Sequence, residues 1–221
     1  MKNISDTYVA KWEELGFSRD KTHAKVAYDW YGSWTTIYNL YADALLCFHL
    51  DGTEDEDSTL AHKDQKPMQH TRKIGFVPRH IYEKQSAWYH NVRQKYGVPL
   101  DSRHLYTKTD WEFFATAVAT KTVRSEVLES VAKWLNETNT DLPFTDLHET
   151  EGKGYYPGPN FFARPVVGGH FAFLALERSC GGRATKGLEF LDKPSHTNNK
   201  ELWDSAANAA ADFSGADKKR L

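Results

Sequence analysis

Residues 96–114, YGVPLDSRHLYTKTDWEFF, join two segments with helical patterning and set the interpretation of the whole chain. The preceding segment, 78–96, has one apolar stripe at helical spacing, whereas the following segment, 111–120, is apolar or small on most sides. An amphipathic helix keeps one face in water, and a helix that is apolar all round is buried on every side. The stretch therefore predicts a connection from an outer helix to an inner helix.

The same alternation extends along the chain. Segments 25–50 and 165–180 are also apolar nearly all round, whereas 122–138 is amphipathic, and strand signals are nearly absent. The pattern predicts an all-α fold with two concentric layers of helices, an α/α toroid, because a plain antiparallel bundle would give every helix a polar face. About five helices are too few for a closed (α/α)6 toroid of about twelve. We therefore expect a partial toroid, an arc of a barrel that another chain could complete.

Local signals refine the ends of these helices. Gly97 is suited to the position just past the helix of 78–96. Thr109-Asp110-Trp111-Glu112 matches a capping box at the start of the next helix. Pro165 suits the first turn of the last inner helix, and Gly181-Gly182 would end it.

The chain divides into three regions on composition. Residues 1–22 are expected to form an irregular entry with a short amphipathic piece, and residues 23–183 the toroid. Within the toroid, 51–76 has no periodicity and is expected to be a surface loop. The rest, 184–221, is expected to be a polar peripheral tail with a weak helix at 206–211.

Charge and hydropathy exclude two classes of bulk partner. The formal net charge is −2, so neither nucleic acid nor a membrane surface is an expected electrostatic partner. Asn39 and Asp43 interrupt the longest apolar run, which is too short to span a bilayer. The expected partner is a small-molecule substrate. The N-terminus lacks the apolar core of a signal peptide, which taken literally predicts a cytosolic protein.

The cysteines leave the redox compartment open. Cys47 and Cys180 lie in apolar segments and are expected to be buried free thiols. No spacing resembles a metal site, and no cofactor is expected. The triplets beginning at Asn3 and Asn136 match N-glycosylation acceptors, which would suit a secreted protein.

The polar clusters of the sequence lie just before or at the start of the inner helices. They are Asp29 with Trp30, the segment 101–110, and the segment 146–164. In a toroid the inner helices run in the same direction, so the loops that precede them open at one mouth. We therefore expect the clusters to converge there. The alternative is that they are solvated surface loops.

Three long strings carry a family resemblance: AYDWYGSWTTIYNLYADALL (27–46), the opening stretch, and FFARPVVGGHFAFLALE (161–177). Together they resemble the C-terminal part of the fungal glutaminase A family. The resemblance implies a six-hairpin, glycosidase-like helical domain from a secreted enzyme that hydrolyses L-glutamine to L-glutamate and ammonia. The family's signal peptide, N-terminal β-rich domain and first helical half have no counterpart in this sequence, which is expected to be a truncated product or a short paralogue.

The residues present favour amide hydrolysis by an activated water. No G-x-S-x-G elbow occurs and no cysteine lies in a polar loop, so a side-chain nucleophile is unsupported. Carboxylates are the remaining candidates for the base, and we select Asp101, Asp110 and Asp29. The alternative for Asp110 is a purely structural role at the helix dipole, and for Asp29 a buried, hydrogen-bonded carboxylate.

Substrate binding is assigned to the neighbouring polar and aromatic residues. A guanidinium can hold a substrate carboxylate in bidentate fashion, and an imidazole can relay a proton. The candidates are Arg103, His104, Trp30, Asp146 and Arg164. Trp30 could instead be part of the core, and Arg164 could only pin its loop. His170 is expected to be a hydrogen-bonded core histidine.

Two other functions remain open on the sequence. Six-hairpin toroids commonly host carbohydrate-active enzymes, whose paired carboxylates could here be Asp101 with Asp110 or Asp29. The chain could also be a catalytically inactive remnant, which would expose apolar flanks where other helices should pack.

Overall fold

The computed structural model describes residues 2–50, 75–139, 143–155, 162–193 and 199–217. Within these ranges the fold is all-α, as predicted, with one sheet of two strands. None of the described helices is both long and apolar enough to cross a membrane. In chain order the elements are α1 (Lys2–Gly16), α2 (Leu40–Leu45), α3 (Arg79–Val92), β1 (Tyr106–Lys108), α4 (Thr109–Ala117), α5 (Lys121–Glu137), β2 (Leu147–Glu149), η2 (Pro165–Phe171), α6 (Ala172–Arg178), η3 (Ser179–Gly182), α7 (Arg183–Lys186), η4 (Glu189–Asp192) and α8 (Asn199–Asp217).

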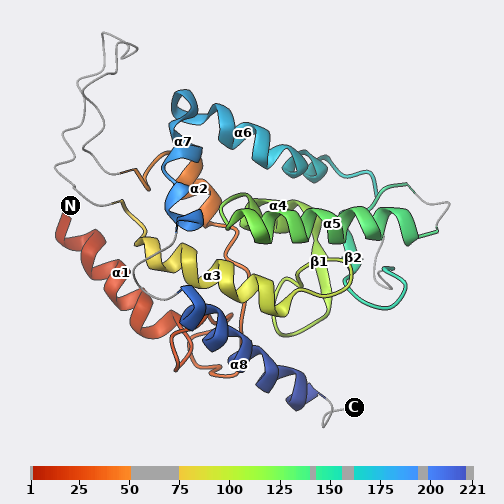
Figure 1. Cartoon of the computed structure of the whole chain (residues 1–221), viewed down its shortest axis with the longest axis horizontal. Helices are drawn as coiled ribbons and strands as arrows, with labels where there is room; N and C mark the ends of the chain where they lie inside the picture. Colours follow the sequence, from red (N-terminus) through yellow and green to blue (C-terminus); the bar gives the residue numbers. More distant parts are fainter. Residues whose placement is uncertain (1, 51–74, 140–142, 156–161, 194–198, 218–221) are drawn as a thin grey trace.

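Helix α3 crosses the middle of the molecule, with α4 and α5 on one side and α8 on the other (Figure 1). Helix α4 contacts α2, α5, η2 and α6, and most of its side chains are buried. Helix α5 buries one stripe and leaves the opposite face in water. The predicted pairing of an inner helix with an amphipathic outer helix is therefore confirmed for α4 and α5.

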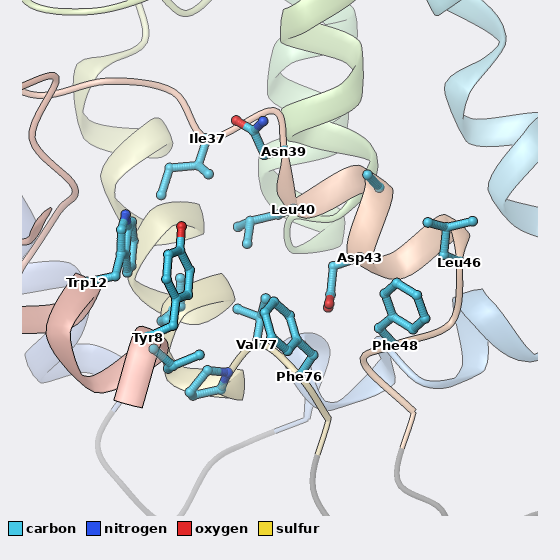
Figure 2. Close-up of a pocket in the computed structure, with 14 residues that line it drawn as sticks. Tyr8, Trp12, Ile37, Asn39, Leu40, Asp43, Leu46, Phe48, Phe76 and Val77 are labelled. Carbon is cyan, nitrogen blue, oxygen red and sulfur yellow. The ribbon is translucent and has the colours of Figure 1, made fainter. Parts of the chain in front are cut away.

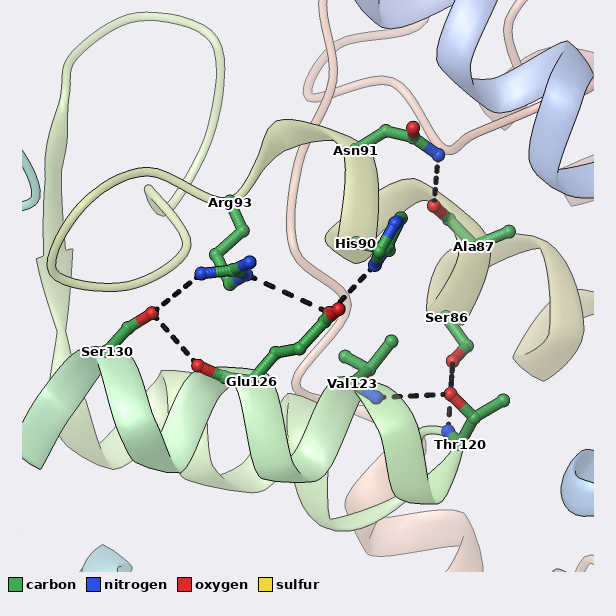
Figure 3. A network of polar contacts seen from close by, with 9 residues as sticks. All are labelled: Ser86, Ala87, His90, Asn91, Arg93, Thr120, Val123, Glu126 and Ser130. Carbon is green, nitrogen blue, oxygen red and sulfur yellow. Dashed lines mark hydrogen bonds and ion pairs between the residues drawn. The ribbon is translucent and has the colours of Figure 1, made fainter.

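A polar network fastens α5 to α3 (Figure 3). His90 Nδ1 lies 2.8 Å from a carboxylate oxygen of Glu126, and Arg93 donates to Ser130 Oγ at 3.0 Å. At the start of α5, Thr120 Oγ1 accepts from the backbone N–H of Val123. Thr120 is thus the N-cap of α5, and these contacts fix the rotation of α5 against α3.

The predicted helix over 25–50 is wrong for most of its length, because only Leu40–Leu45 is helical. The backbone before it finds partners elsewhere: Thr36 N–H donates to the carbonyl of Leu100, and Trp34 N–H donates to Ser102 Oγ. Non-local partners of this kind override the apolar periodicity. As a result Trp30 lies on the surface, so its expected alternative as a core residue is also wrong.

Three further expectations about helix ends are corrected. The capping box at Thr109 does not form, because Glu112 accepts from the N–H of Val98 and the Thr109 hydroxyl turns to the carbonyl of Asp146. Helix α3 ends at Val92, and Gly97 lies in the turn beyond it, with φ of 141°. The apolar segment 165–180 is neither one helix nor buried all round.

That segment splits into the 3₁₀ helix η2 and helix α6. Pro165 begins η2 as predicted, and left-handed residues at Gly181 and Gly182 end the helical run. Phe171 and Leu174 are more than half exposed. The segment is therefore buried only on the side that packs against α4, and its other side is exposed.

The two cysteines form a disulfide, so the prediction of free thiols is wrong. Cys47 follows α2 and Cys180 lies in η3, and their Cα atoms are 6.6 Å apart across a sequence separation of 133 residues. Both cysteines are half-buried. Apolar surroundings suit a free thiol as well as a disulfide, and only spatial proximity distinguishes the two states.

The ends of the chain are more helical than expected. Helix α1 runs over most of the predicted irregular entry and ends at Gly16. Helix α8 is longer than the weak helix expected at 206–211 and packs on α3, with Ala206 buried and the Trp203 ring 4.5 Å from that of His90. The predicted surface loop lies almost entirely outside the described residues.

Candidate functional site

A short antiparallel sheet brings the second and third polar clusters of the sequence together. Strands β1 and β2 pair with Thr107 opposite His148 and Lys108 opposite Leu147. The backbone N–H of Thr109 then donates to the carbonyl of Asp146 at 2.8 Å. This pairing positions the start of α4 against the connector that leads to η2.

Four charged side chains meet at this junction, and we refer to Lys108, Asp110, Asp146 and Arg164 as the ion cluster. Lys108 Nζ lies 3.2 Å from Asp110 Oδ1 and 3.7 Å from Asp146 Oδ2. Arg164 binds Asp146 in bidentate fashion, with Nε donating to Oδ1 at 2.9 Å and Nη2 donating to Oδ2. Two cations and two carboxylates therefore neutralise one another in a buried setting.

Burial and the neighbouring cations have opposite effects on the pKa of Asp146 in the ion cluster. Burial alone would raise the pKa of Asp146, but the hydrogen bonds and charge of Arg164, with Lys108 nearby, outweigh it and hold the pKa below its usual value. Both carboxylates are almost completely buried, whereas Arg164 is one-third exposed. Asp146 is therefore held in its ionised form by its two cationic neighbours.

His170 of η2 approaches the same cluster. Burial lowers the pKa of His170, and the negative charges of Asp110 and Asp146 oppose that shift. Its Nε2 is buried and has no hydrogen-bond partner within the described residues, so the expectation of a satisfied core histidine is wrong. The close approach depends on Gly169, where a Cβ would lie 2.6 Å from Cβ of Asp110.

The other candidate residues line a separate groove of about 1170 Å³, between residues 18–34, residues 91–105 and α8. Asp101 accepts from Arg103 Nε at 2.9 Å and from Arg103 Nη2 at 2.7 Å. The ring of His104 stacks on that of Tyr106 at 4.8 Å, and Trp30 is 42% exposed at the edge. None of the ion cluster residues lines this groove.

The structure thus distributes the predicted site over two places. Asp110, Asp146 and Arg164 meet in the ion cluster, whereas Asp101, Arg103, His104 and Trp30 line the groove. Asp29 is exposed in the turn before Trp30 and makes no side-chain hydrogen bond or ion pair within the described ranges. The expected convergence at one mouth is therefore only partial: part of the second cluster meets the third in the ion cluster, and another part meets Trp30 of the first cluster in the groove.

A second cavity, of about 470 Å³, is apolar and lies between α1, α2 and the start of α3 (Figure 2). Tyr8 and Trp12 of α1 face Leu40 of α2 across it, and Phe48 and Val77 lie along its lower edge in this view. Tyr8 is 60% exposed and Phe48 is 54% exposed. This cavity has few polar groups and no candidate catalytic residue.

Glu112 is another buried carboxyl group, which the sequence analysis assigned only to the capping box. It accepts from the N–H of Val98 at 2.6 Å, and burial raises the pKa of Glu112 to about 8. The group is therefore neutral at pH 7. It supports the turn before β1 and does not serve as a base.

Sequence reasoning gave no role to Lys108 and assigned His170 to the core. A signal for Lys108 existed: it lies two residues before Asp110, in a short polar run entering an inner helix. For His170 the signal was the preceding Gly168-Gly169 pair, which permits a close approach of two backbones. Within the described residues no group of three or more His, Cys, Asp or Glu is arranged to hold a metal ion.

The described helices, with a buried carboxylate cluster at the start of an inner helix, form a domain of the helical-hairpin class. The chain belongs to the glutaminase A six helical-hairpin domain family, which matches residues 1–59 and 53–174. This agrees with the predicted partial toroid and with the resemblance seen in the sequence.

Two curated relatives carry glutaminase names. The chain is 66% identical over 202 residues to a protein of Arthroderma benhamiae named probable glutaminase, covering 91% of this chain and 23% of that protein. It is 39% identical over 176 residues to glutaminase A of Aspergillus oryzae, covering 79% of this chain and 22% of that protein. The chain thus spans about a quarter of the length of these relatives. No solved structure matches it.

Proposed function

We propose that this chain supplies part of the active site of an enzyme that hydrolyses the side-chain amide of L-glutamine, giving L-glutamate and ammonia. Membership of the glutaminase A family and the names of both relatives support a glutaminase-like function in general. The observation that carries the specific proposal is the ion cluster, where Asp110 lies beside a cation and within electrostatic range of His170.

In this proposal Asp110 is the general base. It takes a proton from water as the water oxygen attacks the amide carbon. The ammonium of Lys108 stabilises the negative charge that develops on the carbonyl oxygen. The proton then passes from Asp110 to the amide nitrogen, the C–N bond breaks, and ammonia leaves with glutamate as the second product.

The neighbouring groups take supporting roles. Arg164 is one-third exposed and uses Nε and Nη2 to bind Asp146, so its Nη1 group is the part that we assign to the substrate α-carboxylate. His170, with its free ring nitrogen, can assist the proton transfer to the leaving group. The N-terminus of α4 lies directly after Lys108, and its partial positive charge adds to the stabilisation of the developing oxyanion.

The other two carboxylates are weaker candidates for the base. Both oxygens of Asp101 are bound by Arg103, which lowers their availability to a water. Asp29 is exposed and makes no side-chain hydrogen bond or ion pair within the described residues, so no contact there fixes its position. Asp110 is favoured because it combines burial, a neighbouring cation and proximity to an imidazole.

We propose further that helices from outside this chain complete the site. The family description implies six hairpins. In addition, Tyr8 and Phe48 line the apolar cavity beside α1 and are exposed, and a further helix packed there would cover them. The helices would come from the remainder of a protein as long as the relatives, or from a second copy of the chain. The same exposure favours the alternative that this chain is inactive on its own.

We also propose that the protein matures in an oxidising compartment and is secreted. The disulfide between Cys47 and Cys180 supports this, because such bonds persist in secreted proteins and are rare in the cytosol.

The test is ammonia release from L-glutamine, measured for this chain and for a longer protein that contains it. Asp110→Asn should lower kcat by about 100-fold or more, because general-base catalysis contributes that much. Asp204→Asn, at an exposed position on α8, is the matched control and should retain full activity. An Asp110→Asn enzyme as active as the control would exclude Asp110 as the base. Release of reducing sugar from oligosaccharides, without ammonia from glutamine, would support the glycosidase alternative instead.

A further inference from the structure

Trp111 of α4 directly follows Asp110, the proposed base, and its side chain is only half-buried. The hydrophobic core of the described residues includes Phe113 and has Phe114 packed against it, but it does not include Trp111. Aromatic rings normally stabilise a fold by packing in its core, so a large ring outside the core requires a different explanation.

The indole of Trp111 contacts both the ion cluster and a tyrosine. Lys108 Nζ lies 4.8 Å from the centre of the Trp111 ring, within the distance of about 6 Å at which a ring face attracts a cation. The ring of Tyr38 stacks on the same indole, with a centroid distance of 4.1 Å and an interplanar angle of 29°. The indole thus joins Lys108 to the segment before α2.

Tyr38 is itself fixed by its surroundings. The N–H of Ile37, the preceding residue, donates to the hydroxyl of Tyr89 at 2.8 Å. Tyr38 also packs against the hydrophobic core. A side chain that is locked by packing and hydrogen bonds holds its neighbour in one orientation. The stacked Trp111 ring is therefore a fixed surface for Lys108.

Two carboxylates are also neighbours of the Lys108 ammonium. Its Nζ lies 3.2 Å from Asp110 Oδ1 and 3.7 Å from Asp146 Oδ2, and the Lys108 side chain is 16% exposed. A third carboxylate at the position of the indole would add negative charge and accept a further N–H. A ring face attracts a cation through its quadrupole and does neither. An ammonium has three N–H donors, so two carboxylates and a ring leave one donor for a substrate oxygen.

We infer that Trp111 is a positioning residue, which holds the Lys108 ammonium where it stabilises the developing oxyanion. The kinetic part of this inference rests on the proposed glutamine hydrolysis, in which Lys108 has that role. Trp111 acts through Lys108 and is assigned no contact with the substrate. An interaction that is made only in the transition state raises kcat and leaves KM unchanged. Loss of the ring should therefore lower kcat alone.

The experiment measures ammonia release from L-glutamine by Trp111 variants in the wild-type and Lys108→Met backgrounds, for this chain and for a longer protein that contains it. Trp111→Leu should lower kcat about tenfold with KM unchanged, because Lys108 is mostly shielded from water, where a cation attracts a ring most strongly. Trp111→Phe keeps a ring face and should retain most of the activity. In the Lys108→Met background, Trp111→Leu should have no further effect on kcat.

Trp203→Leu is the matched control. Trp203 of α8 is also half-buried, but it packs against the hydrophobic core and its ring contacts that of His90. Its replacement should lower the midpoint of thermal unfolding and leave kcat unchanged. If Trp111→Leu lowers kcat by the same factor in both backgrounds, Trp111 only supports α4. Either that result or an unchanged kcat in the wild-type background overturns the inference.

Thermal melts of the wild type, the two single variants and the double variant test the contact without relying on activity. The drop in Tm caused by Trp111→Leu should be smaller in the Lys108→Met background, because the contact between ring and ammonium is already absent there. If neither the chain nor the longer protein releases ammonia, the proposed hydrolysis fails and the melts decide the inference. Equal drops in Tm in both backgrounds would then overturn it.

Discussion

Replacing Glu112 by Gln should change how the stability of this protein depends on pH. Burial raises the pKa of Glu112 to about 8 in the folded chain, from its usual value of 4.5 in the unfolded chain. Between these pH values the folded chain therefore holds one proton more than the unfolded chain. The stabilisation is complete below pH 4.5 and is lost as the pH rises toward 8.

The magnitude follows from the size of the shift. Each pH unit in this window removes about 1.4 kcal/mol from the free energy of unfolding, so the wild type should lose about 3 kcal/mol between pH 4.5 and 7. Glutamine keeps the shape and the oxygen that accepts from Val98 but cannot ionise. The Glu112→Gln variant should therefore match the wild type near pH 4.5 and exceed it by about 3 kcal/mol at pH 7.

The assay is urea unfolding followed by far-ultraviolet circular dichroism at pH 5, 6, 7 and 8. Glu129→Gln, at an exposed position on α5, serves as the control and should follow the wild type at every pH. The quantity of interest is the difference in unfolding free energy between variant and wild type. If that difference is the same at all four pH values, Glu112 is not a buried, protonated group and the reasoning fails.

Three further predictions use the same unfolding assay. Replacing both Cys47 and Cys180 by Ser should lower the unfolding free energy by about 5 kcal/mol, because the disulfide closes a sequence separation of 133 residues; an unchanged midpoint would contradict this. Thr120→Ala should cost about 1 kcal/mol, because Val123 N–H loses its cap, whereas Thr120→Ser should cost much less. Burial lowers the pKa of His148 to about 4, so the contribution of His148 to the unfolding free energy should be full above pH 6.5 and should be lost as the pH falls through 4. His148→Gln should reduce that acid-induced loss by up to about 3 kcal/mol. Equal acid sensitivity of the variant and the wild type would contradict this prediction.

The parts of the fold that could be predicted are those whose structure is decided locally. The stripe on α5 specifies both the helix and its buried face, since Val123, Val127 and Trp134 recur at helical spacing. The segment 25–39 could not be predicted in this way. Its backbone pairs with residues about 65 positions away, as Thr36 does with Leu100, and no local pattern encodes that partner.

The same limit explains the candidate site. Asp110, Asp146 and Arg164 could each be selected as a polar residue beside an inner helix, but their mutual contacts depend on the pairing of β1 with β2. Strands of three residues leave almost no periodic signal in a sequence. The disulfide could not be predicted for a related reason. Cys47 and Cys180 each lie in an apolar segment, but nothing in the sequence shows that the two segments are neighbours in the fold.

The disulfide also determines what a protease can do to this molecule. A single cut anywhere between Cys47 and Cys180 would separate the chain into two pieces, yet the pieces would remain one covalent molecule. The cut would open a ring and leave the N-terminal helix tied to the C-terminal region through sulfur. The bond therefore protects the connectivity of the protein at every position within that span, including those that carry the ion cluster.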